Sequence, residues 1–344
     1  MNMTDVEYFV KVAELMSFSK AAEALYVTQQ AVSLHVKHLE DTYGVRLFER
    51  KPSLRLTPAG KRMLEAARDI SEREQRLISE FSSSRDQFDG EISIGLPPNR
   101  STAFVNEFFP VFCKAYPRMS LRLDERTSSN LSAAVRHNEI DIALPLQADY
   151  TGEYDPDTFQ TIPLETESLY LVISDDMLRA AFPERYPACR LEFLQGVSLF
   201  DFAALPMFLH PSTSHLHETI VNKLVRNGTP PNIRIRTSLT SSLISLCVDG
   251  YGIFFSTPML LRHLYKTNRE NFDTLNIFPV QEYRENRRTL LLYHCQKYLT
   301  RPLEDSIAMI RRIYANHAVF IDELRQSKIR QITALYGEED MASG

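Results

Sequence analysis

The sequence predicts a multidomain α/β protein in which a small N-terminal winged helix-turn-helix is followed by a long helix and a large α/β part. Three observations lead to this fold class. The first sixty residues read as three short helices and a hairpin. The stretch from Thr57 to about Arg85 holds no proline or glycine beyond Pro58 and Gly60. Over the rest of the chain, strand-like and helix-like runs alternate.

The composition is that of an ordinary globular protein with two or three domains. The 344 residues carry a formal net charge of −5, and no apolar run approaches the about 20 residues that cross a bilayer. The N-terminus lacks a positively charged start, so we expect a cytoplasmic protein without a membrane association. The four cysteines lie far apart without a CxxC pair, and we expect buried, reduced thiols rather than a redox switch.

Two short helices are expected at the N-terminus. Residues 5–16 place apolar side chains at helical spacing, and Ser19 can cap a second helix over residues 20–25. The side chains of the first helix that we expect in the core are Val6, Phe9, Val10, Ala13 and either Leu15 or Met16.

A third helix follows a turn at residues 26–27. Thr28 can cap it, it runs from Gln29 to about Asp41, and Gly44 can end it. At about 100° per residue, Val32, Val36 and Leu39 share one stripe, which we assign to the core.

The opposite face of the third helix is a candidate reading surface for DNA. Its members are Gln30, Ser33, Leu34, Lys37 and Asp41, with Gln29 in the first turn. The second helix of a helix-turn-helix fits a major groove, where amide and hydroxyl groups bind base edges and a lysine binds phosphate. A plain solvated face is the alternative. Leu34 either contacts a thymine methyl group or packs on a neighbouring loop.

Positive charge gathers around this helix. From residue 34 to residue 62 there are seven Lys and Arg against three Asp and Glu, which is typical of a face that meets a polyanion. Two short extended stretches around Pro52 and Ser53 predict a hairpin, or wing, that contacts the DNA backbone or minor groove. The wing carries Arg46, Arg50, Lys51 and Arg55.

Residues 17–60, SFSKAAEALYVTQQAVSLHVKHLEDTYGVRLFERKPSLRLTPAG, resemble the N-terminal winged helix-turn-helix of LysR-type transcriptional regulators. The shared elements are S-F-x-x-A-A-x-x-L, the TQ–AVS start of the third helix, LE…G–LF-R and the closing LT-AG. The resemblance implies DNA binding through a defined set of residues. They are Thr28, Gln29, Gln30, Ser33, Leu34, Lys37, Arg50 and Arg55.

Three departures from the family pattern bear on those contacts. Leu34 stands where many members carry a basic residue, and Gln30 replaces a common proline. The wing is also a residue short, which affects the role of Arg55.

The long helix over residues 58–88 has an apolar seam that it cannot bury alone. Met63, Ile70 and Leu77 are seven apart, with a second row at Ala67, Glu74 and Phe81. The helix either pairs with a second copy or packs on its own second domain. The family resemblance favours a homodimer or homotetramer, which places two reading helices on the half-sites of an interrupted palindrome.

The remaining chain predicts an α/β fold with a mainly parallel sheet. The strand spacing and the motif VDGYGIFFSTP (residues 248–258) resemble the two-lobed, periplasmic-binding-protein-like effector domain of the same regulators. We therefore expect four parts: a DNA-binding domain over 1–57, a linker helix over 58–88, an effector-binding domain over 89–298, and a C-terminal helical extension and tail over 299–344. Beyond about residue 328 the tail has no family counterpart.

Three hydroxyl-rich helix starts follow strands of this domain and could hold a small anion such as a carboxylate. The candidate effector-binding residues are Arg100, Ser101, Thr102, Ser212, Thr213 and Ser238. That these starts face one cleft follows from the resemblance. Ser and Thr also cap helices without any ligand, and Arg100 is either a counter-ion or points to solvent.

Other function classes find little support. His210, His215 and His217 have spacings that do not suit a metal site, so we expect no metal, cofactor or catalytic residue. No nucleophile elbow, P-loop, GxGxxG or HExxH motif is present. The expected partners are double-stranded DNA, a small-molecule effector and further copies of the chain. An alternative is a DNA-binding assembly protein whose effector domain only oligomerises.

Overall fold

A computed structural model of the chain describes residues 2–49, 53–82, 88–147, 154–212, 214–237, 240–283 and 287–336, and for residues 71–82, 215, 240 and 241 the backbone alone. It divides into two compact units: Met1–Asp89 with the short segments Arg136–Glu139 and Gln296–Pro302, and the remainder of the chain. The helices of these ranges include none with the length and apolarity of a membrane-spanning helix.

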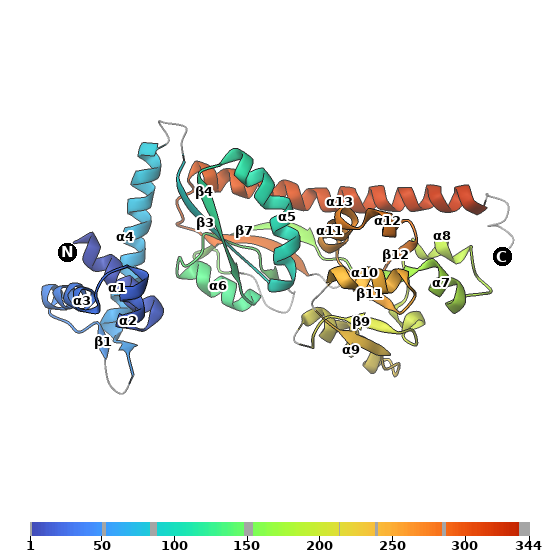
Figure 1. Cartoon of the computed structure of the whole chain (residues 1–344), viewed down its shortest axis with the longest axis horizontal. Coiled ribbons are helices and arrows are strands. Elements are labelled where there is room, and N and C mark those ends of the chain that lie inside the picture. The colour runs from blue at the N-terminus through green and yellow to red at the C-terminus, as the bar shows by residue number, and fades with distance from the viewer. Residues whose placement is uncertain are drawn as a thin grey trace. The chain divides into compact units, whose positions relative to one another are not determined.

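The first unit is a helical domain with a small hairpin, drawn in blue in Figure 1. Its elements are α1 (Met3–Leu15), α2 (Phe18–Ala24), α3 (Gln29–Tyr43), β1 (Phe48–Glu49), β2 (Arg55–Leu56) and α4 (Pro58–Ser82). One apolar cluster joins α1, α2, α3 and the hairpin. The predicted order of helix, helix, helix, hairpin and long helix is confirmed.

Two details of the first two helices differ from the prediction. The cap of α2 is Ser17, whose side chain accepts a hydrogen bond from the Lys20 N–H. Ser19 instead lies inside the helix. In α1, Val6, Phe9 and Ala13 are buried as predicted and Val10 is partly buried against the same core, whereas Leu15 and Met16 are 40% and 39% exposed. Val12, which was not predicted, is fully buried and joins this stripe.

The second unit begins with a lobe built on a six-stranded mixed sheet of order β4-β3-β5-β13-β6, with β7 paired to β13. Its elements are β3 (Gly90–Leu96), α5 (Pro98–Ala115), β4 (Met119–Glu125), α6 (Ser128–Arg136), β5 (Ile142–Ala143), β6 (Leu146–Gln147), β7 (Phe159–Thr166) and β13 (Arg288–His294). The β3 strand pairs in parallel with β4 and β5, whereas β13 is antiparallel to its neighbours.

The second lobe is built on a five-stranded sheet of order β10-β9-β11-β8-β12. Its strands are β8 (Tyr170–Ser174), β9 (Met207–Leu209), β10 (Ile233–Arg236), β11 (Ile253–Ser256) and β12 (Leu275–Pro279). Its helices are α7 (Asp175–Ala181), α8 (Cys189–Phe193), the 3-10 helix at Leu199–Phe202, α9 (His215–Arg226), α10 (Thr240–Val248), α11 (Pro258–Thr267) and α12 (Arg269–Phe272). Two apolar clusters pack against this sheet.

The prediction of a mainly parallel sheet is wrong for both lobes. The chain passes from β7 into β8, and from β12 toward β13, with no helix among the described residues of either passage. These four strands are antiparallel to their neighbours. The β7–β8 passage leads from the first lobe to the second and the β12–β13 passage leads back, so the paired strands run in opposite directions.

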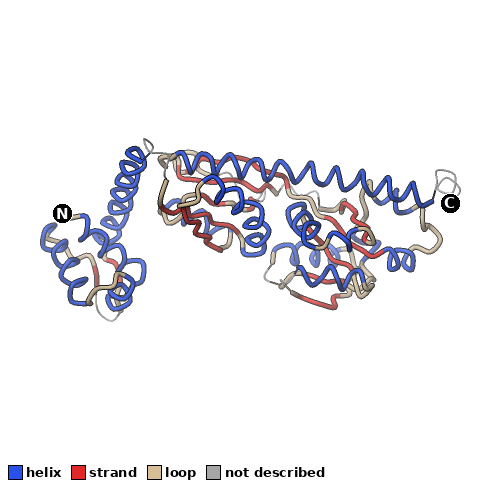
Figure 2. Tube along the Cα trace, turned by 45° about the horizontal axis from the view of Figure 1, so that its top comes forward, coloured by secondary structure: helices blue, strands red, loops and turns tan. Residues whose placement is uncertain are grey.

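One long helix, α13 (Arg301–Tyr336), closes the second unit. Figure 2 shows it as a single continuous helix that lies along both lobes, as it also does in Figure 1.

Candidate DNA-binding face and interlobe site

The α3 helix is held by the residues that the sequence analysis assigned to its ends and core. The Thr28 side chain accepts a hydrogen bond from the Ala31 N–H at 3.2 Å, and Gly44 ends the helix with φ 65°. Val32, Val36 and Leu39 are fully buried. These predictions are confirmed, and they fix which side of α3 faces away from the core.

The outer face of α3 presents the predicted DNA-contact side chains. Gln29, Gln30 and Lys37 are exposed and Ser33 is half-buried. The Gln29 Oε1 accepts a hydrogen bond from the Ser19 hydroxyl at 3.0 Å, which ties the start of α3 to α2. Leu34 is 67% exposed. This exposure excludes the alternative that Leu34 packs on a neighbouring loop.

A buried carboxylate that the sequence analysis missed joins α3 to α1. Asp5 Oδ1 and Oδ2 lie 2.7 Å from the Nδ1 atoms of His35 and His38, respectively. Burial alone would raise the pKa of Asp5, but the hydrogen bonds from His35, His38 and Asn2 outweigh it and hold that pKa below its ordinary value. Asp5 is thus an ionised anchor that sets the position of α3 on α1.

The wing hairpin is only partly described, and its apolar side chains join the same core as α3. The β1 and β2 strands are antiparallel, with Glu49 opposite Arg55. Arg55 is exposed and its Nε donates to the Ser53 hydroxyl at 3.1 Å. Arg50, the other predicted wing contact, lies outside the described residues.

A close backbone approach fixes α4 against the wing. A Cβ atom on Gly60 would meet the Leu47 carbonyl oxygen at 2.1 Å, so only glycine fits there. The Thr57 hydroxyl donates to the Arg46 carbonyl oxygen at 2.6 Å and also accepts from the Gly60 N–H at 2.9 Å. The T-P-A-G sequence is therefore the joint between wing and long helix. Ala67 of the predicted seam is fully buried, and the side chains of Glu74, Leu77 and Phe81 lie outside the description.

The predicted effector-binding residues of α5 differ from expectation. The helix starts at Pro98, and the Ser101 hydroxyl donates to the Pro98 carbonyl oxygen at 2.8 Å. Thr102 is exposed. Arg100 neither points to solvent nor is free to be a counter-ion. It is 4% exposed, donates to the Glu167 carboxylate, and donates to the Thr289 hydroxyl at 3.0 Å.

The other predicted helix starts are only partly described. Ser212 is exposed in the loop between β9 and α9. Thr213 and Ser238 lie outside the described residues. The described hydroxyl groups therefore do not by themselves define a common site.

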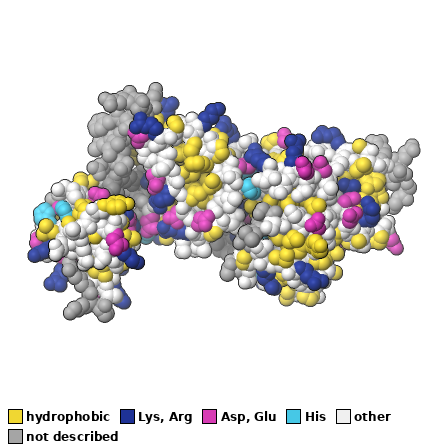
Figure 3. All heavy atoms as spheres, viewed as in Figure 1, with side chains coloured by type: hydrophobic (Ala, Val, Ile, Leu, Met, Phe, Trp, Pro, Cys, Tyr) yellow, Lys and Arg dark blue, Asp and Glu magenta, His cyan; other side chains and the backbone are white. Residues whose placement is uncertain are grey.

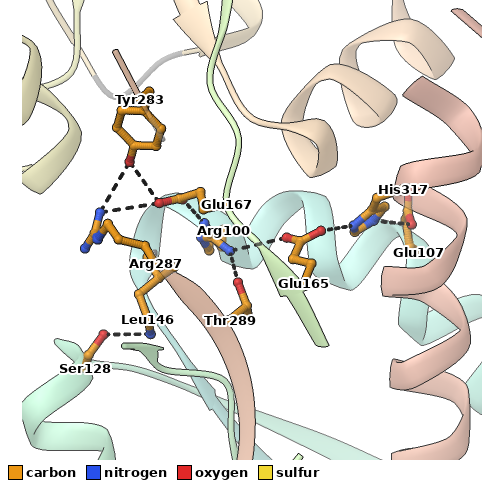
Figure 4. Close-up of polar contacts among 10 residues, drawn as sticks. All are labelled: Arg100, Glu107, Ser128, Leu146, Glu165, Glu167, Tyr283, Arg287, Thr289 and His317. Atoms are coloured by element: carbon orange, nitrogen blue, oxygen red, sulfur yellow. Dashed lines mark hydrogen bonds and ion pairs between the residues drawn. The ribbon is translucent and has the colours of Figure 1, made fainter. Parts of the chain in front are cut away.

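Figure 4 shows the network around Arg100, at the point where the chain passes between the lobes. Glu167 lies between β7 and β8, and its Oε2 accepts from the Tyr283 hydroxyl at 2.9 Å and from Arg287 Nη1 at 3.4 Å. The Glu167 N–H also donates to the Arg287 carbonyl oxygen at 2.7 Å. The carboxylate of Glu167 thus occupies a cage of two arginines and a phenol.

The electrostatics of this network follow from its burial. Burial raises the pKa of the Tyr283 phenol, and the neighbouring Glu167 raises it further. Burial alone would lower the pKa of Arg100, but Glu167 and Glu165 outweigh it and raise that pKa. Arg100 therefore stays charged beside its carboxylates, as a buried charge must. No local pattern marks Glu167, Tyr283 or Arg287, because their partners lie far away along the chain.

The histidines and cysteines show no metal cluster within the described ranges. His217 Nδ1 lies 2.8 Å from the His210 carbonyl oxygen, so these residues bind each other. Cys189 and Cys247 are buried, and burial raises the pKa of both thiols, that of Cys247 to about 12. Cys113 and Cys295 are half-buried.

A cavity of about 530 Å³ opens in the second lobe. Figure 3 shows hydrophobic side chains, in yellow, gathered on the surface of this lobe. The cavity is lined by Pro206, Phe208, Arg234, Ile235, Leu246, Gly250 and Tyr251. None of these is among the predicted effector-binding residues.

Comparison with known proteins gives matches over both units. A family model described as bacterial regulatory helix-turn-helix protein, lysR family, matches residues 3–61, and the LysR substrate binding domain matches residues 85–315. The hydrogen peroxide-inducible genes activator of Dickeya chrysanthemi is 30% identical over 74% of this chain and 78% of its own.

Solved structures share the fold. A full-length OxyR variant from Pseudomonas aeruginosa has a TM-score of 0.60 at 19% identity and covers 91% of this chain and 94% of its own. Full-length CbnR, crystallised with its target DNA, has a TM-score of 0.50 at 19% identity and covers 91% of this chain and all (100%) of its own.

Proposed function

Because the chain belongs to the LysR family of bacterial DNA-binding transcriptional regulators, we propose that it binds an interrupted palindromic promoter site as a dimer or tetramer. We further propose that a small-molecule effector between its two α/β lobes adjusts this binding.

The observation that carries the proposal is the outer face of α3. Thr28, Gln29, Gln30, Ser33, Leu34 and Lys37 lie on or before a helix whose other side is fully buried. In our proposal Gln30 and Ser33 contact base edges, Leu34 contacts a thymine methyl group and Lys37 contacts a phosphate. Arg50 and Arg55 of the wing contact the DNA backbone or the minor groove.

Two such faces are brought to successive half-sites if α4 pairs with a second copy of itself. The length of α4, 25 residues, supports this part of the proposal. Half-sites one or more helical turns apart then follow from the two-fold symmetry.

The effector remains a small polar molecule of unspecified identity, with a carboxylate as one candidate. Ser101, Thr102, Ser212, Thr213 and Ser238 remain its proposed contacts. We remove Arg100 from the proposed effector contacts, because its charge is already paired with Glu167.

A second candidate function has one observation in its favour. Glu167 fills the cationic cage at the crossing between the lobes with a carboxylate of the chain itself. An effector domain that serves only for assembly needs no ligand there. In either case we propose a cytoplasmic protein that is not an enzyme and uses no cofactor, in line with its regulatory relatives.

Peroxide sensing is not part of the proposal. The Dickeya chrysanthemi relative is named for genes induced by hydrogen peroxide. In this chain burial raises the pKa of the Cys189 and Cys247 thiols, which lowers the thiolate fraction that peroxide oxidises.

Footprinting of purified full-length protein on DNA flanking its own gene tests the DNA-binding proposal. We expect protection of one symmetric, interrupted site whose affinity falls steeply with salt. Protection of no defined site would contradict the proposal.

A thermal-shift screen with carboxylates, amino acids, aromatic acids and sugars tests the effector. A ligand at about 100 times its dissociation constant adds about 2.7 kcal/mol to the free energy of unfolding. A stabilising compound would name the effector class, whereas a blank panel would favour the assembly function.

A further inference from the structure

The α13 helix connects the two lobes of the second unit along a single rigid rod. In its first half, Asp305 accepts a hydrogen bond from the Tyr116 hydroxyl at the end of α5 in the first lobe. In its second half, Phe320 and Leu324 belong to one apolar core cluster of the second lobe. Ile332 belongs to the other cluster. Helix α13 therefore contacts both lobes and supplies core side chains to the second.

Polar contacts fasten the second half of α13 to the second lobe. The buried Lys328 ammonium donates to the Phe272 carbonyl oxygen and, at 3.3 Å, to that of Asp273. Arg325 Nη2 donates to Gln195 Oε1 at 2.8 Å, and the hydroxyls of Tyr186 and Tyr336 lie 2.7 Å apart. This half lies beyond residue 315, where the match to the family's substrate-binding domain ends.

Helix α13 contains no residue that would favour a kink. After Pro302, in its first turn, α13 contains neither proline nor glycine up to Tyr336, and sharp kinks in helices occur mainly at such residues. A change of the lobe angle therefore requires one half of α13 to leave its lobe.

His317 lies in the middle of α13, where the two halves meet. It is 1% exposed, and its ring stands between two carboxylates (Figure 4). Nδ1 lies 3.2 Å from Glu165 Oε2, and Nε2 lies 3.3 Å from Glu107 Oε2. Both partners are acceptors when ionised, so the ring must donate from both nitrogens. Only the imidazolium can do so.

Both carboxylates that bind this ring belong to the first lobe, and one of them also binds the second lobe. Glu165 lies on β7 and its Oε1 is 3.9 Å from Arg100 Nη1. Glu107 lies on α5 and binds Arg262 and, at 3.4 Å, Lys266, both on α11 of the second lobe. The imidazolium thus holds α13 to the first lobe, and Glu107 continues the ionic chain from there to the second lobe.

Among the described residues, Tyr314, His263 and, through Glu167, Tyr283 are further titratable groups beside this ionic chain, and burial raises the pKa of Tyr283. The Tyr314 ring lies 5.1 Å from the His317 ring, measured between centroids, and burial raises the pKa of its phenol. His263 on α11 has a pKa lowered by burial, against the raising effect of Glu107. Tyr314 stays neutral over the range in which a histidine titrates, and we use His317 as the variable group.

We propose that α13 clamps the two lobes together and that His317 is its latch, closed as the imidazolium between Glu107 and Glu165 and released when the ring loses its proton. The inference rests on the proposed function only in one respect: the release of α13 would regulate DNA binding. The clamp itself is a property of the effector-binding domain and is tested without DNA.

The direction of the pH dependence follows from linkage. Burial alone would lower the pKa of His317, but the hydrogen bonds and charges of Glu107 and Glu165 outweigh it and raise that pKa. A raised pKa means that docking is complete below the ordinary value of about 6.5 and weakens as pH rises through the raised value. Between the two, the docking constant falls about tenfold per pH unit.

The first measurement is nitrogen NMR of full-length protein with labelled histidine, titrated from about pH 6 to about pH 9. The His317 signals are those missing from His317→Gln among the nine histidines. We expect both ring nitrogens to stay protonated beyond the pH at which an ordinary histidine becomes neutral. A neutral tautomer at about pH 6.5 would overturn the latch.

The second measurement is hydrogen exchange of α13 peptides over the same pH range, corrected for the intrinsic rate of exchange. In the native chain, protection of residues 303–317, the half of α13 that His317 holds to the first lobe, should fall with pH in one step of about tenfold per unit. The second half also carries Lys328, whose pKa burial lowers to about 8, so its protection is not used to assign the step. His317→Gln should lose that step and keep low protection throughout. The matched control is His137→Gln, at an exposed histidine, which should keep the native step.

If His317→Gln does not fold, Glu165→Gln tests the role of His317 with a smaller change. Glu165→Gln leaves one carboxylate, which a neutral imidazole can satisfy, so the step should move toward the ordinary histidine pKa while protection at neutral pH remains. A merely structural role would lower protection evenly and leave the step in place. Protection that does not vary with pH in the native chain, or a step that persists in His317→Gln, would overturn the proposal.

Discussion

Arg100 on α5 donates to the carboxylate of Glu167, 67 residues further along the chain, and both side chains are buried. The pair stands where the first lobe ends and the second begins, and Tyr283 and Arg287 of the return passage bind the same carboxylate. Both passages between the lobes are therefore held by one ion cluster.

Arg100→Ala should lower the free energy of unfolding by about 3 to 5 kcal/mol, because it leaves the Glu167 carboxylate buried with fewer partners. Denaturant unfolding of the full-length protein measures this change. The control is Arg122→Ala, at an arginine whose side chain is 44% exposed and pairs with Glu91. A surface pair contributes about 1 kcal/mol or less. Equal losses in the two variants would contradict the assigned role of Arg100.

Asp5→Asn should destabilise the first unit and remove part of its acid sensitivity. The hydrogen bonds to His35 and His38 hold the pKa of Asp5 below its unfolded value. The contribution of Asp5 is therefore complete above an unfolded pKa of about 3.9 and is lost as pH falls through the folded value. At neutral pH the variant should lose about 2 kcal/mol, typical of a hydrogen bond to a charged group.

Unfolding curves from about pH 3 to about pH 7 measure this effect. Asp41→Asn, at an exposed aspartate on α3, is the control and should change stability little. If Asp5→Asn had the same pH dependence as the native chain, Asp5 would not be the ionised anchor of α3.

Lys37→Ala and Gln30→Ala should separate affinity from sequence reading on the α3 face. Loss of a phosphate contact weakens binding to all sequences and lowers the salt slope by about 1, whereas loss of a base contact costs about 1 to 3 kcal/mol at one base pair. Both side chains are exposed, so neither change should affect folding.

Anisotropy titrations on the footprinted site and on its single-base variants, at several salt concentrations, distinguish the two effects. Lys114→Ala, at an exposed lysine of α5, is the matched control for charge. A salt slope that falls equally in Lys37→Ala and Lys114→Ala would show that Lys37 makes no special contact.

The parts that the sequence predicted correctly are those set by short-range chemistry. The cap at Thr28, the end at Gly44 and the buried stripe of α3 depend on residues a few positions apart. The cap of α2 was misplaced because Ser17 and Ser19 stand two residues apart and both suit an N-cap.

The parts that could not be predicted depend on distant partners. The partners of His317 lie 152 and 210 residues away, so no periodicity or local motif marks them. Arg100 was expected to face a ligand because a helix start favours anions. The structure supplies that anion from the chain itself, through a passage between lobes that carries no helical or strand pattern.

Gly60→Ala tests the joint between the wing and α4. The added Cβ would come within 2.1 Å of the Leu47 carbonyl oxygen, which is backbone and cannot rotate away. Helix α4 would have to shift from β1, so we expect a loss of about 1 to 3 kcal/mol in stability, as for an overpacked core. Intrinsic helix propensity acts in the other direction, since alanine is the better helix former by about 1 kcal/mol. Ala66→Ser, at an exposed position of the same helix, is the control. Denaturant unfolding followed by helical circular dichroism measures both variants, and a Gly60→Ala protein as stable as the native chain would show that the joint can widen without loss.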